Sequence, residues 1–561
     1  MNTGIRRCRR SLLESVSVSK SDGGIERMCQ VGIDMASVVW DYVVIGAGSA
    51  GCALTEQLVR AGKSVLLLEA GGRDRSPYIK VPAGQLRAIA CHDWGYLAEA
   101  DLTRNGIVES WARGRVLGGS SSVNGTIYTR GVPSDYDGWG LPGWSWEEVL
   151  PIFQEFEGSD QPGPLRGQSG SLSIRTVRHP HAVTRAFVRA AQSLNLPFNA
   201  DYNGRSQEGV GFAQLSQRRG FRCSAADAFL RAVSRHRNLS VLLNALVTRI
   251  EFANRRAVAV HFEEDGKSGR AAARGVVLCA GAINSPQVLM LSGIGDAQEL
   301  RRKQIELVLD RPAVGRNLQD QSLISPLYRT TVPTYNLTEG LWQKMGYAAK
   351  FLLYGEGPLS NLFEAAAFLR SSASLRLPDL QVIFSAIGYR KNGDGRYVIE
   401  DVPSVMVHVM LSYPESRGRI SLRSSNPSDP PSIECPLLEA SADAKKLIAG
   451  FRMVRRIMEA APMAPLILAE ALPGKDAESD ATLEDYVRRH AGIAFHPIGT
   501  CRMGLGPDAV VGPDLRVQGI ENLWIADASV IPKHPSANTN AVCIMVGRKL
   551  GRELAAKSRE A

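Results

Sequence analysis

The clearest pattern of hydrophobic and polar positions lies near the N-terminus, where two short apolar runs flank a glycine-rich segment. Residues 42–45 (Tyr-Val-Val-Ile) are mostly β-branched, which predicts a buried parallel strand. The glycine-rich segment follows at once, and apolar residues then recur at helical spacing up to Gly62. Residues 64–68 (Ser-Val-Leu-Leu-Leu) predict a second strand with Glu69 at its end. The order is therefore strand, glycine-rich turn, helix, strand and acid.

This order is typical of a dinucleotide-binding site. Gly46, Gly48 and Gly51 allow a tight turn and a close approach of the backbone to a pyrophosphate. Ser49 stands where the helix begins, and the amides of that first turn would hold the phosphates. Glu69 can accept a hydrogen bond from a ribose hydroxyl, which disfavours the 2′-phosphate of NADP. The turn alone does not decide between FAD and NAD.

Two further apolar patterns predict elements later in the chain. Residues 275–281 form a buried strand that ends in glycine and leads into a helix over 282–291, which glycines close. Residues 541–557 show helical periodicity with basic residues toward the end. Asn538, Thr539 and Asn540, just before or at its start, are all candidate N-caps for this last helix.

Two segments carry polar chemistry without such regularity. The Gly/Ser-rich run 114–124 is too rich in small residues to pack a core, so it is either a flexible surface loop or a site of close approach to a flat ligand. His496 begins the sequence His-Pro-Ile-Gly-Thr-Cys-Arg-Met-Gly. A histidine of this kind is usually structural. A base near one end of the chain and a dinucleotide site near the other nevertheless point to oxidation of an alcohol.

Composition narrows the class of protein. A chain of 561 residues exceeds one compact core, so we expect two domains. The net charge of +10 is spread thinly, without a basic run, so we expect no nucleic-acid partner. The nine cysteines form no C-x-x-C pair, and no His/Asp/Glu cluster has metal-ligand spacing, so we expect no metal site. Scattered thiols of this kind are typical of a cytoplasmic protein.

We expect no transmembrane segment, because no apolar run reaches about 18 residues. Attachment to a membrane, if any, would be peripheral. Residues 1–37 are polar and aperiodic, which predicts a disordered N-terminal extension. The natural start is expected at Met28 or Met35.

The chain resembles the glucose–methanol–choline (GMC) flavoprotein oxidoreductases, in particular their choline dehydrogenase and alcohol dehydrogenase-like branch. Several long motifs in the family's order carry the resemblance, which spans about residues 40 to 556: 114–137, 281–295, 314–320 and 522–529. One departure is Gln321, where many relatives have a histidine, so an acid–base role at that position is in doubt.

The resemblance implies FAD as the cofactor. Its contacts would come from the Rossmann turn, the Gly/Ser run, a backbone contact to adenine and the C-terminal segment: Gly46, Gly48, Ser49, Gly51, Glu69, Val116, Gly119, Ser120, Asn124, Val247, Asp527, Asn538 and Thr539. Some members attach the flavin to a histidine in the Gly/Ser run. Val123 occupies that position here, which predicts non-covalent FAD.

By the same resemblance, His496 is the catalytic base and Asn538 its partner, which donates to the substrate oxygen. The base removes the hydroxyl proton, and the hydride passes to flavin N5, giving an aldehyde or ketone. The electron acceptor would be O2, a quinone or a redox protein. The alternatives are a flavin-containing lyase, a non-catalytic flavoprotein of the same fold and a nicotinamide-linked dehydrogenase.

The predicted architecture is α/β with two interleaved domains. A Rossmann-like FAD-binding domain would comprise residues 38–160, 205–318 and 488–556. The substrate-binding domain, a mixed or antiparallel sheet covered by helices, would comprise 161–204 and 319–487.

The substrate-domain residues show no readable substrate motif, although alternation predicts strands over 380–384 and 405–410. A neutral alcohol is favoured over choline, because no clear aromatic and carboxylate cage for a quaternary ammonium is visible. Glu364 is the one candidate carboxylate for such a cage.

Overall fold

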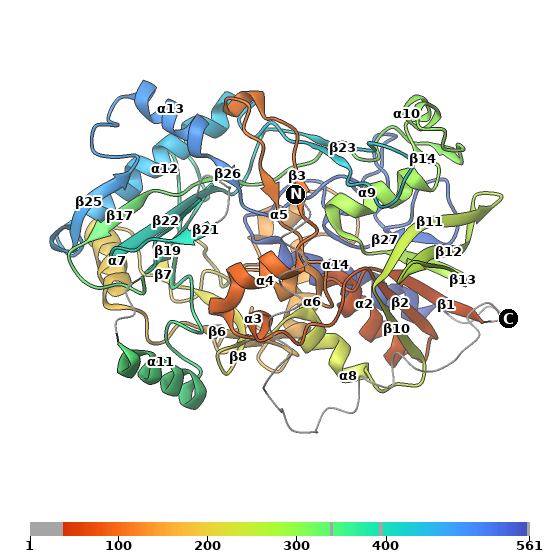
Figure 1. The fold of residues 1–561 in the computed structure, drawn as a ribbon, viewed down its shortest axis with the longest axis horizontal. Helices are drawn as coiled ribbons and strands as arrows, with labels where there is room; N and C mark the ends of the chain where they lie inside the picture. Colours follow the sequence, from red (N-terminus) through yellow and green to blue (C-terminus); the bar gives the residue numbers. More distant parts are fainter. Residues whose placement is uncertain (1–37, 337–339, 392–396, 558–561) are drawn as a thin grey trace.

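The structure is a computed structural model that describes residues 38–336, 340–391 and 397–557. Two large sheets dominate it, one on each side of the view in Figure 1. The first sheet has seven strands in the order β10 (Leu239–Leu243), β2 (Val65–Glu69), β1 (Val39–Ile45), β13 (Lys267–Leu278), β12 (Arg256–Glu264) and β11 (Ala245–Ala253), with β27 (Leu523–Ile525) paired to β13.

Local sequence determines the first βαβ unit. The strands β10, β2, β1, β13 and β27 run parallel. After β1, Gly46 adopts a φ of +99°, and a Cβ there would lie 2.5 Å from the carbonyl oxygen of Cys279. A Cβ on Gly51 would lie 2.0 Å from the Gly46 carbonyl oxygen. Only glycine fits either place, and helix α2 (Ser49–Arg60) then leads to β2. The predicted strand–turn–helix–strand is confirmed.

The C-terminal helix α14 (Thr539–Ala556) packs directly on α2 (Figure 1). Two glycines permit the close crossing: a Cβ on Gly547 would lie 2.4 Å from the carbonyl oxygen of Ala50, and one on Gly551 would lie 3.0 Å from Cβ of Gln57. Ser49 Oγ also donates to Asn540 Oδ1 at 2.7 Å, so the two helices begin near each other. The predicted helices over 282–291 and 541–557 are confirmed as α9 (Gly281–Leu291) and α14.

The second sheet has eight strands, and all of its pairings are antiparallel. Its order is β25 (Ile467–Leu472), β17 (Leu327–Thr330), β22 (Ser404–Leu411), β19 (Leu380–Ser385), β18 (Ala365–Leu369) and β7 (Gly209–Phe212), with β16 (Ser322–Ile324) paired to β22 and to β26 (Gly492–Ile493). The predicted α/β architecture with an antiparallel second sheet is confirmed.

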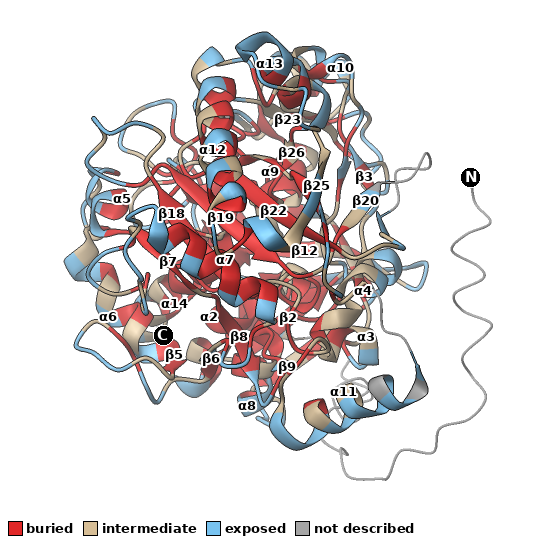
Figure 2. Cartoon of the chain, turned by 90° about the vertical axis from the view of Figure 1, so that its left-hand side faces the viewer, coloured by how far each residue is buried: buried red, intermediate tan, exposed pale blue. Residues whose placement is uncertain are grey.

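Helices cover the second sheet, as Figure 2 shows for α7 (Ala182–Ser193) and α12 (Ser441–Glu459). The Phe187 ring of α7 stacks on Phe384 of β19 with 4.5 Å between ring centroids. Every residue of β19 and β22 is buried. The alternating pattern that predicted these two strands therefore does not mark one solvent-exposed face and one buried face, because both faces of the sheet are covered here.

Sheet membership crosses the domain ranges expected from sequence. β7 and β26 pair into the second sheet, although their residues fall in the ranges 205–318 and 488–556. The division of the chain into 38–160, 205–318 and 488–556 against 161–204 and 319–487 therefore stays a proposal. A four-stranded sheet, β5 (Glu157–Ser159), β6 (Leu172–Thr176), β8 (Gln214–Arg218) and β9 (Phe221–Arg222), lies near the first of these boundaries.

The expectations for residues 1–37 lie outside the described residues. Within the described ranges, no helix is both long and apolar enough to cross a membrane. The same part of the chain holds no group of three or more His, Cys, Asp or Glu side chains arranged to bind a metal ion.

Candidate active site

The carboxyl ends of the parallel strands meet at one edge of the first sheet, where several predicted cofactor residues gather. Gly46 follows β1, Glu69 ends β2 and Asp527 follows β27. β2 and β13 lie on either side of β1 in the sheet. The chain segments that follow these neighbouring strands therefore leave this edge in opposite directions. Such an edge is where open α/β sheets bind ligands.

Glu69 is held by two backbone amides at this edge. Its Oε2 accepts from Ala47 N–H at 2.9 Å, and its Oε1 accepts from Gly71 N–H at 2.8 Å. Burial raises the pKa of Glu69 to about 7. Val116 lies against the segment that follows Glu69, because a Cβ on Gly71 would be 2.3 Å from the Val116 nitrogen. Val247 lies on β11 in the same sheet and is buried.

The Gly/Ser run packs against the Rossmann turn. A Cβ on Gly119 would lie 2.7 Å from Cα of Gly48, so only glycine allows this contact. Gly119 begins the 3₁₀ helix η4 (Gly119–Ser122), and Val123 after it is buried. The run is therefore packed inside the protein and is not a surface loop, and its close approach to a flat ligand stays a prediction.

Two more residues of this run have defined partners. Ser120 Oγ accepts from Gly114 N–H at 3.1 Å. Asn124 Oδ1 accepts from Arg222 Nη1 at 2.6 Å. Burial lowers the pKa of Arg222 to about 10, which leaves it a cation at neutral pH. Both contacts hold the Gly/Ser run in place from within the protein.

Helix N-termini supply free hydrogen-bond donors beside these glycines. Neither α2 nor α14 has a side chain that caps its first turn, and Ser49 Oγ joins them by donating to Asn540 Oδ1 at 2.7 Å. Thr539 opens α14. Uncapped amides, a positive helix end and glycine surfaces fit a long ligand with phosphates and many acceptor atoms. The residues present therefore fit FAD.

Asp527 makes three contacts within the protein. Its Oδ2 accepts from Gly281 N–H at 2.8 Å and from Ser285 Oγ at 2.5 Å, and its Oδ1 accepts from Ser529 N–H at 2.8 Å. Burial raises the pKa of Asp527. This carboxylate fixes the start of α9 against the end of β27. The FAD contact expected of Asp527 remains a proposal.

His496 and Asn538, far apart in sequence, lie together. Asn538 Nδ2 is 3.2 Å from His496 Nε2. Asn538 is the residue before α14, yet its side chain does not cap the helix. Its Oδ1 instead accepts from Thr129 Oγ1 at 2.5 Å and from Gln381 Nε2 at 3.2 Å. These two donors fix the amide with Nδ2 toward the histidine.

Gln321 fixes the other side of the imidazole. Its Nε2 donates to the Ser412 carbonyl oxygen at 3.2 Å, so its Oε1 faces His496 Nδ1 at 2.8 Å. An amide oxygen only accepts, which assigns the ring hydrogen to Nδ1. Nε2 is then the lone-pair nitrogen and faces the Asn538 amide. The two amides select one tautomer.

The surroundings keep this imidazole neutral. Burial lowers the pKa of His496 well below its ordinary value, and His534 and Arg113 lower it further. The Asp320 carboxylate accepts a hydrogen bond from the backbone N–H of His496 at 3.0 Å. Burial raises the pKa of Asp320 to about 7. The ring of His534 contacts the His496 carbonyl oxygen at 3.1 Å. A neutral imidazole with its lone pair on Nε2 can act as a proton acceptor.

Sequence reasoning missed three contributors to this arrangement. Thr129 lies inside the 114–137 motif but was not singled out, and Gln381 belongs to no motif. Only tertiary packing brings the loop after η4 and strand β19 to Asn538. Gln321 stood out as a departure from the family pattern, but its contact with His496 was not foreseen. Its place directly after the 314–320 motif was the available signal.

Comparison with known proteins agrees with this geometry. Two family models described as GMC oxidoreductase match residues 40–323 and 414–547. An alcohol dehydrogenase [acceptor] of Pseudomonas putida is 36% identical over 528 residues, covering 91% of this chain and 94% of the relative. An oxygen-dependent choline dehydrogenase of Brucella anthropi is 38% identical, covering 92% and 97%.

Among solved structures, pyridoxine 4-oxidase from Mesorbium loti has a TM-score of 0.83 and 30% sequence identity, covering 92% of this chain and 99% of that one. GMC oxidoreductases bind FAD, in agreement with the glycine surfaces and uncapped helix ends. The prediction of an oxidoreductase is confirmed. The matches extend over both sheets and nearly the whole described chain, and this chain belongs to the GMC oxidoreductase family.

Proposed function

We propose that this protein oxidises a neutral alcohol to an aldehyde or ketone with FAD, using His496 as the base. One observation carries the proposal: in a buried site, the lone-pair nitrogen of His496 lies 3.2 Å from an amide donor of Asn538. A hydroxyl group placed beside both side chains would find an acceptor for its proton and a donor for its oxygen. The relatives named for alcohol and choline oxidation support the same reaction class.

Each protein group has a separate part in the reaction. His496 Nε2 takes the hydroxyl proton, and Asn538 Nδ2 donates to the oxygen as negative charge develops on it. Nδ1–H of the ring, now an imidazolium, continues to donate to Gln321 Oε1. When bound, FAD supplies the acceptor for the hydride of the carbinol carbon. The proton and the hydride together are the two-electron loss that makes a carbonyl.

The residues proposed to hold FAD are those at the sheet edge and in the Gly/Ser run. Gly46, Gly48, Ser49 and Gly51 would hold the pyrophosphate, and Glu69 the ribose. The remaining proposed contacts come from Val116, Gly119, Ser120, Asn124, Val247, Asp527, Asn538 and Thr539.

We propose that the flavin is not covalently attached, since Val123 offers no nucleophile. Acid precipitation tests this directly. The yellow colour should stay in the supernatant, and colour retained in the washed pellet would contradict it.

An apolar cluster beside the catalytic pair supports a substrate with an apolar body. Ile383 lies two residues from Gln381 on β19, and Met410 stands directly opposite Gln381 on β22, so these side chains share one face of the sheet. Leu323, two residues after Gln321, pairs with Met410. The cluster gathers around this face: Ile127, Val177, Phe212, Ala213, Leu215, Leu323, Phe363, Ile383, Met410 and Ala494.

The environment of Glu364 supports a neutral alcohol over choline. Its carboxylate is buried and accepts from His181 N–H at 2.9 Å, Thr184 Oγ1 at 2.5 Å and Tyr335 Oη at 3.0 Å. Burial raises its pKa. Both oxygens are already engaged, which favours a structural role in joining the start of α7 to β18 over recognition of a cation.

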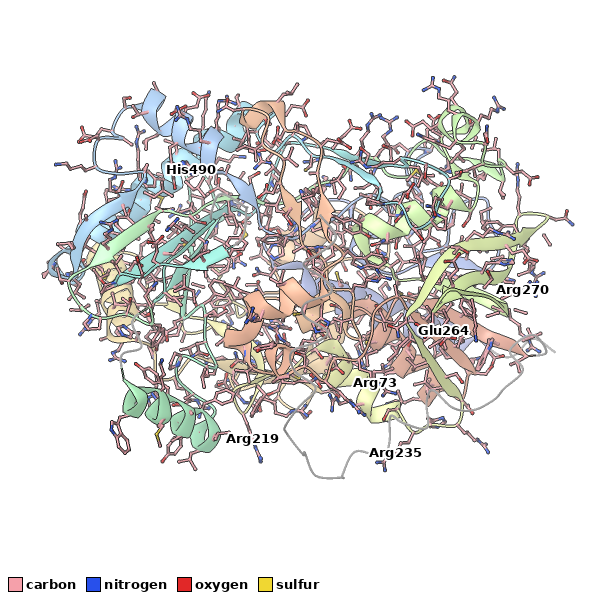
Figure 3. The ribbon with its side chains drawn as sticks, viewed as in Figure 1. Arg73, Arg219, Arg235, Glu264, Arg270 and His490 are labelled. Atoms are coloured by element: carbon pink, nitrogen blue, oxygen red, sulfur yellow. The ribbon has the colours of Figure 1, made fainter. Side chains whose placement is uncertain are left out.

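Anaerobic reduction of the purified holoprotein tests the proposal. A panel of aliphatic, aromatic and quaternary-ammonium alcohols is added, and the visible absorbance of the flavin is followed. Neutral alcohols should bleach it, whereas His496→Ala should bleach slower by about 10²-fold or more. The exposed His490→Ala on α13 (Asp480–His490) is the matched control (Figure 3). A flavin that dithionite reduces but no alcohol reduces would overturn alcohol oxidation in favour of a lyase or a non-catalytic role.

Admission of air to the reduced protein identifies the electron acceptor. Fast recolouring indicates O2 as the acceptor. Slow recolouring that a quinone or a redox protein accelerates indicates a dehydrogenase. Turnover that requires NADH or NAD⁺ without flavin would favour the nicotinamide-linked alternative.

A further inference from the structure

Helix α11 (Leu341–Tyr354) presents an apolar stripe on its outer side. Trp342, Leu352 and Leu353 are 83%, 74% and 73% exposed, and Met345 is 51% exposed. Ala349 between them is also exposed. These positions follow one another at helical spacings of three, four and seven, so they share one face. Solvent is an unfavourable environment for so many large apolar side chains on one helix.

The opposite side of α11 is already packed on its own chain. Phe351 is 4% exposed, and its ring lies 4.7 Å from that of Phe221. Tyr347 makes an edge contact with Tyr335 at 6.4 Å between ring centroids. At the helix end, a Cβ on Gly220 would lie 2.4 Å from the Gly355 carbonyl oxygen. The inner face is thus occupied, and the outer stripe has no partner among the described residues.

Basic side chains accompany the stripe. The helix sequence contains Lys344 and Lys350 and no acidic residue. Arg218, the last residue of β8, and Arg219, in the turn that follows, are both exposed. Figure 3 shows Arg219 beside α11, with Arg235 along the same lower margin of the molecule. The overall charge of +10 has the same sign.

We propose that the outer stripe of α11 docks on a lipid surface whose anionic headgroups contact the neighbouring lysines and arginines. An amphipathic helix with Leu and Trp on one side and Lys nearby is the form that lies in a membrane interface. Trp342 at one end and Tyr354 at the other, 71% exposed, are residue types that prefer this interface. Basic side chains near the surface add attraction to anionic lipid.

The size and place of the stripe favour lipid over a second protein. A helix of this length is about 21 Å long and about 10 Å wide, so its footprint is about 200 Å². A stable protein interface buries about 800 Å² on each partner. In Figures 1 and 2, α11 stands at the outer edge of the molecule, so a flat surface could reach it. This inference does not depend on the reaction proposed above.

Vesicle flotation of the holoenzyme tests the inference. Wild-type protein is mixed with vesicles of phosphatidylcholine alone or of phosphatidylcholine with phosphatidylglycerol. It should float with the anionic vesicles, less with the neutral ones, and less at high salt. Leu352→Asp/Leu353→Asp should reduce flotation at least about 10-fold, because two charges would be placed on the outer stripe, the side of the helix that would enter the lipid.

The matched control places the same substitution on exposed leucines elsewhere. Leu102 and Leu468 are 87% and 66% exposed and lie outside α11, so Leu102→Asp/Leu468→Asp should float like wild type. Bound FAD and melting temperature, measured for each variant, show that the fold is intact. Trp342→Ala gives a second variant of the stripe without added charge.

Results of two kinds would overturn the inference. One is wild-type protein that does not float with anionic vesicles, or a double variant on α11 that floats as well as wild type. The other is a wild-type dimer in sedimentation velocity that the α11 variant converts to monomer while vesicles bind neither. That outcome would assign the stripe to a second copy of the chain.

Discussion

Gln321 Oε1 lies 2.8 Å from His496 Nδ1, while Nε2 of the same amide donates to the Ser412 carbonyl oxygen at 3.2 Å. Turning the amide over would place its NH2 group against Nδ1–H and its oxygen against a carbonyl, so both contacts would be lost. The orientation of one glutamine therefore determines which nitrogen of the His496 imidazole is basic. A histidine at position 321 could carry a proton of its own, whereas glutamine cannot.

Removing this acceptor should slow the reaction. Gln321→Leu leaves Nδ1–H buried without a partner and lets the ring adopt the other tautomer or turn. We expect kcat to fall about 10-fold to 100-fold, a part of the about 10²–10⁴ that a positioned base contributes. Stopped-flow reduction of the bound flavin measures it. Gln319→Leu is the matched control, because Gln319 Nε2 donates to the Pro532 carbonyl oxygen; an equal loss in both variants would contradict a specific role for Gln321.

Replacing the amide by a carboxylate should shift the pH profile. Gln321→Glu keeps an acceptor at Nδ1 but adds a negative charge, which stabilises the imidazolium and raises the pKa of His496. The acidic limb of kcat/KM should therefore move to higher pH than in wild type. A purely structural effect of position 321 would lower the rate at all pH values without moving this limb.

The wild-type enzyme should keep its activity in mild acid. Burial lowers the pKa of His496 well below the ordinary value of 6.5, and a base works only when it is neutral. Activity is lost as pH falls through the folded-state pKa, so the acidic limb of kcat/KM should lie below pH 6.5. The profile is measured with a substrate that does not titrate in this range. An acidic limb at or above pH 6.5 would show that His496 is not the base or that its imidazole is exposed to solvent.

The elements that sequence alone predicted are those that local geometry determines. Gly46 and Gly51 stand where any Cβ would clash with backbone atoms, so the positions of the glycines alone predict the turn. Helix α14 was visible from apolar spacing. The pairing of His496 with Asn538 came from resemblance, because no local pattern connects residues so far apart in the chain.

What sequence missed depends on tertiary packing. Thr129 and Gln381 are ordinary polar residues until the loop after η4 and strand β19 meet Asn538 at the start of α14. The short strands β7 and β26 join a sheet far from their sequence neighbours, so no periodicity assigns them to it. Candidate N-caps were also ambiguous: Asn538 precedes α14 but directs its side chain to His496.

Asn538, although one of the proposed FAD contacts, should matter more for the rate than for FAD retention. Asn538→Ala removes the donor opposite His496 Nε2, and loss of one such donor costs about 10²–10³ in kcat. Asn538→Asp should be at least as slow, because a carboxylate oxygen beside the substrate oxygen opposes its developing charge. Flavin reduction rate and FAD-to-protein ratio are measured together.

Asn540→Ala is the control at the same helix end, because the Asn540 side chain accepts from Ser49 Oγ on α2 rather than binding His496. It should lower the FAD-to-protein ratio more than the rate per bound flavin. A loss of rate in Asn538→Ala that only mirrors lost FAD would contradict a catalytic role for its amide.

Gly119→Ala should separate the two glycine-rich segments and weaken FAD binding. The new methyl group would lie 2.7 Å from Cα of Gly48, a backbone atom that cannot rotate away, so the Gly/Ser run must move off the Rossmann turn. Gly106→Ala is the matched control: its φ of +76° imposes a comparable left-handed strain, about 1 kcal/mol, but nothing lies within 4 Å of the new methyl group. We expect Gly119→Ala to purify with much less FAD than Gly106→Ala. Equal FAD content in the two variants would show that this contact does not form part of the FAD site.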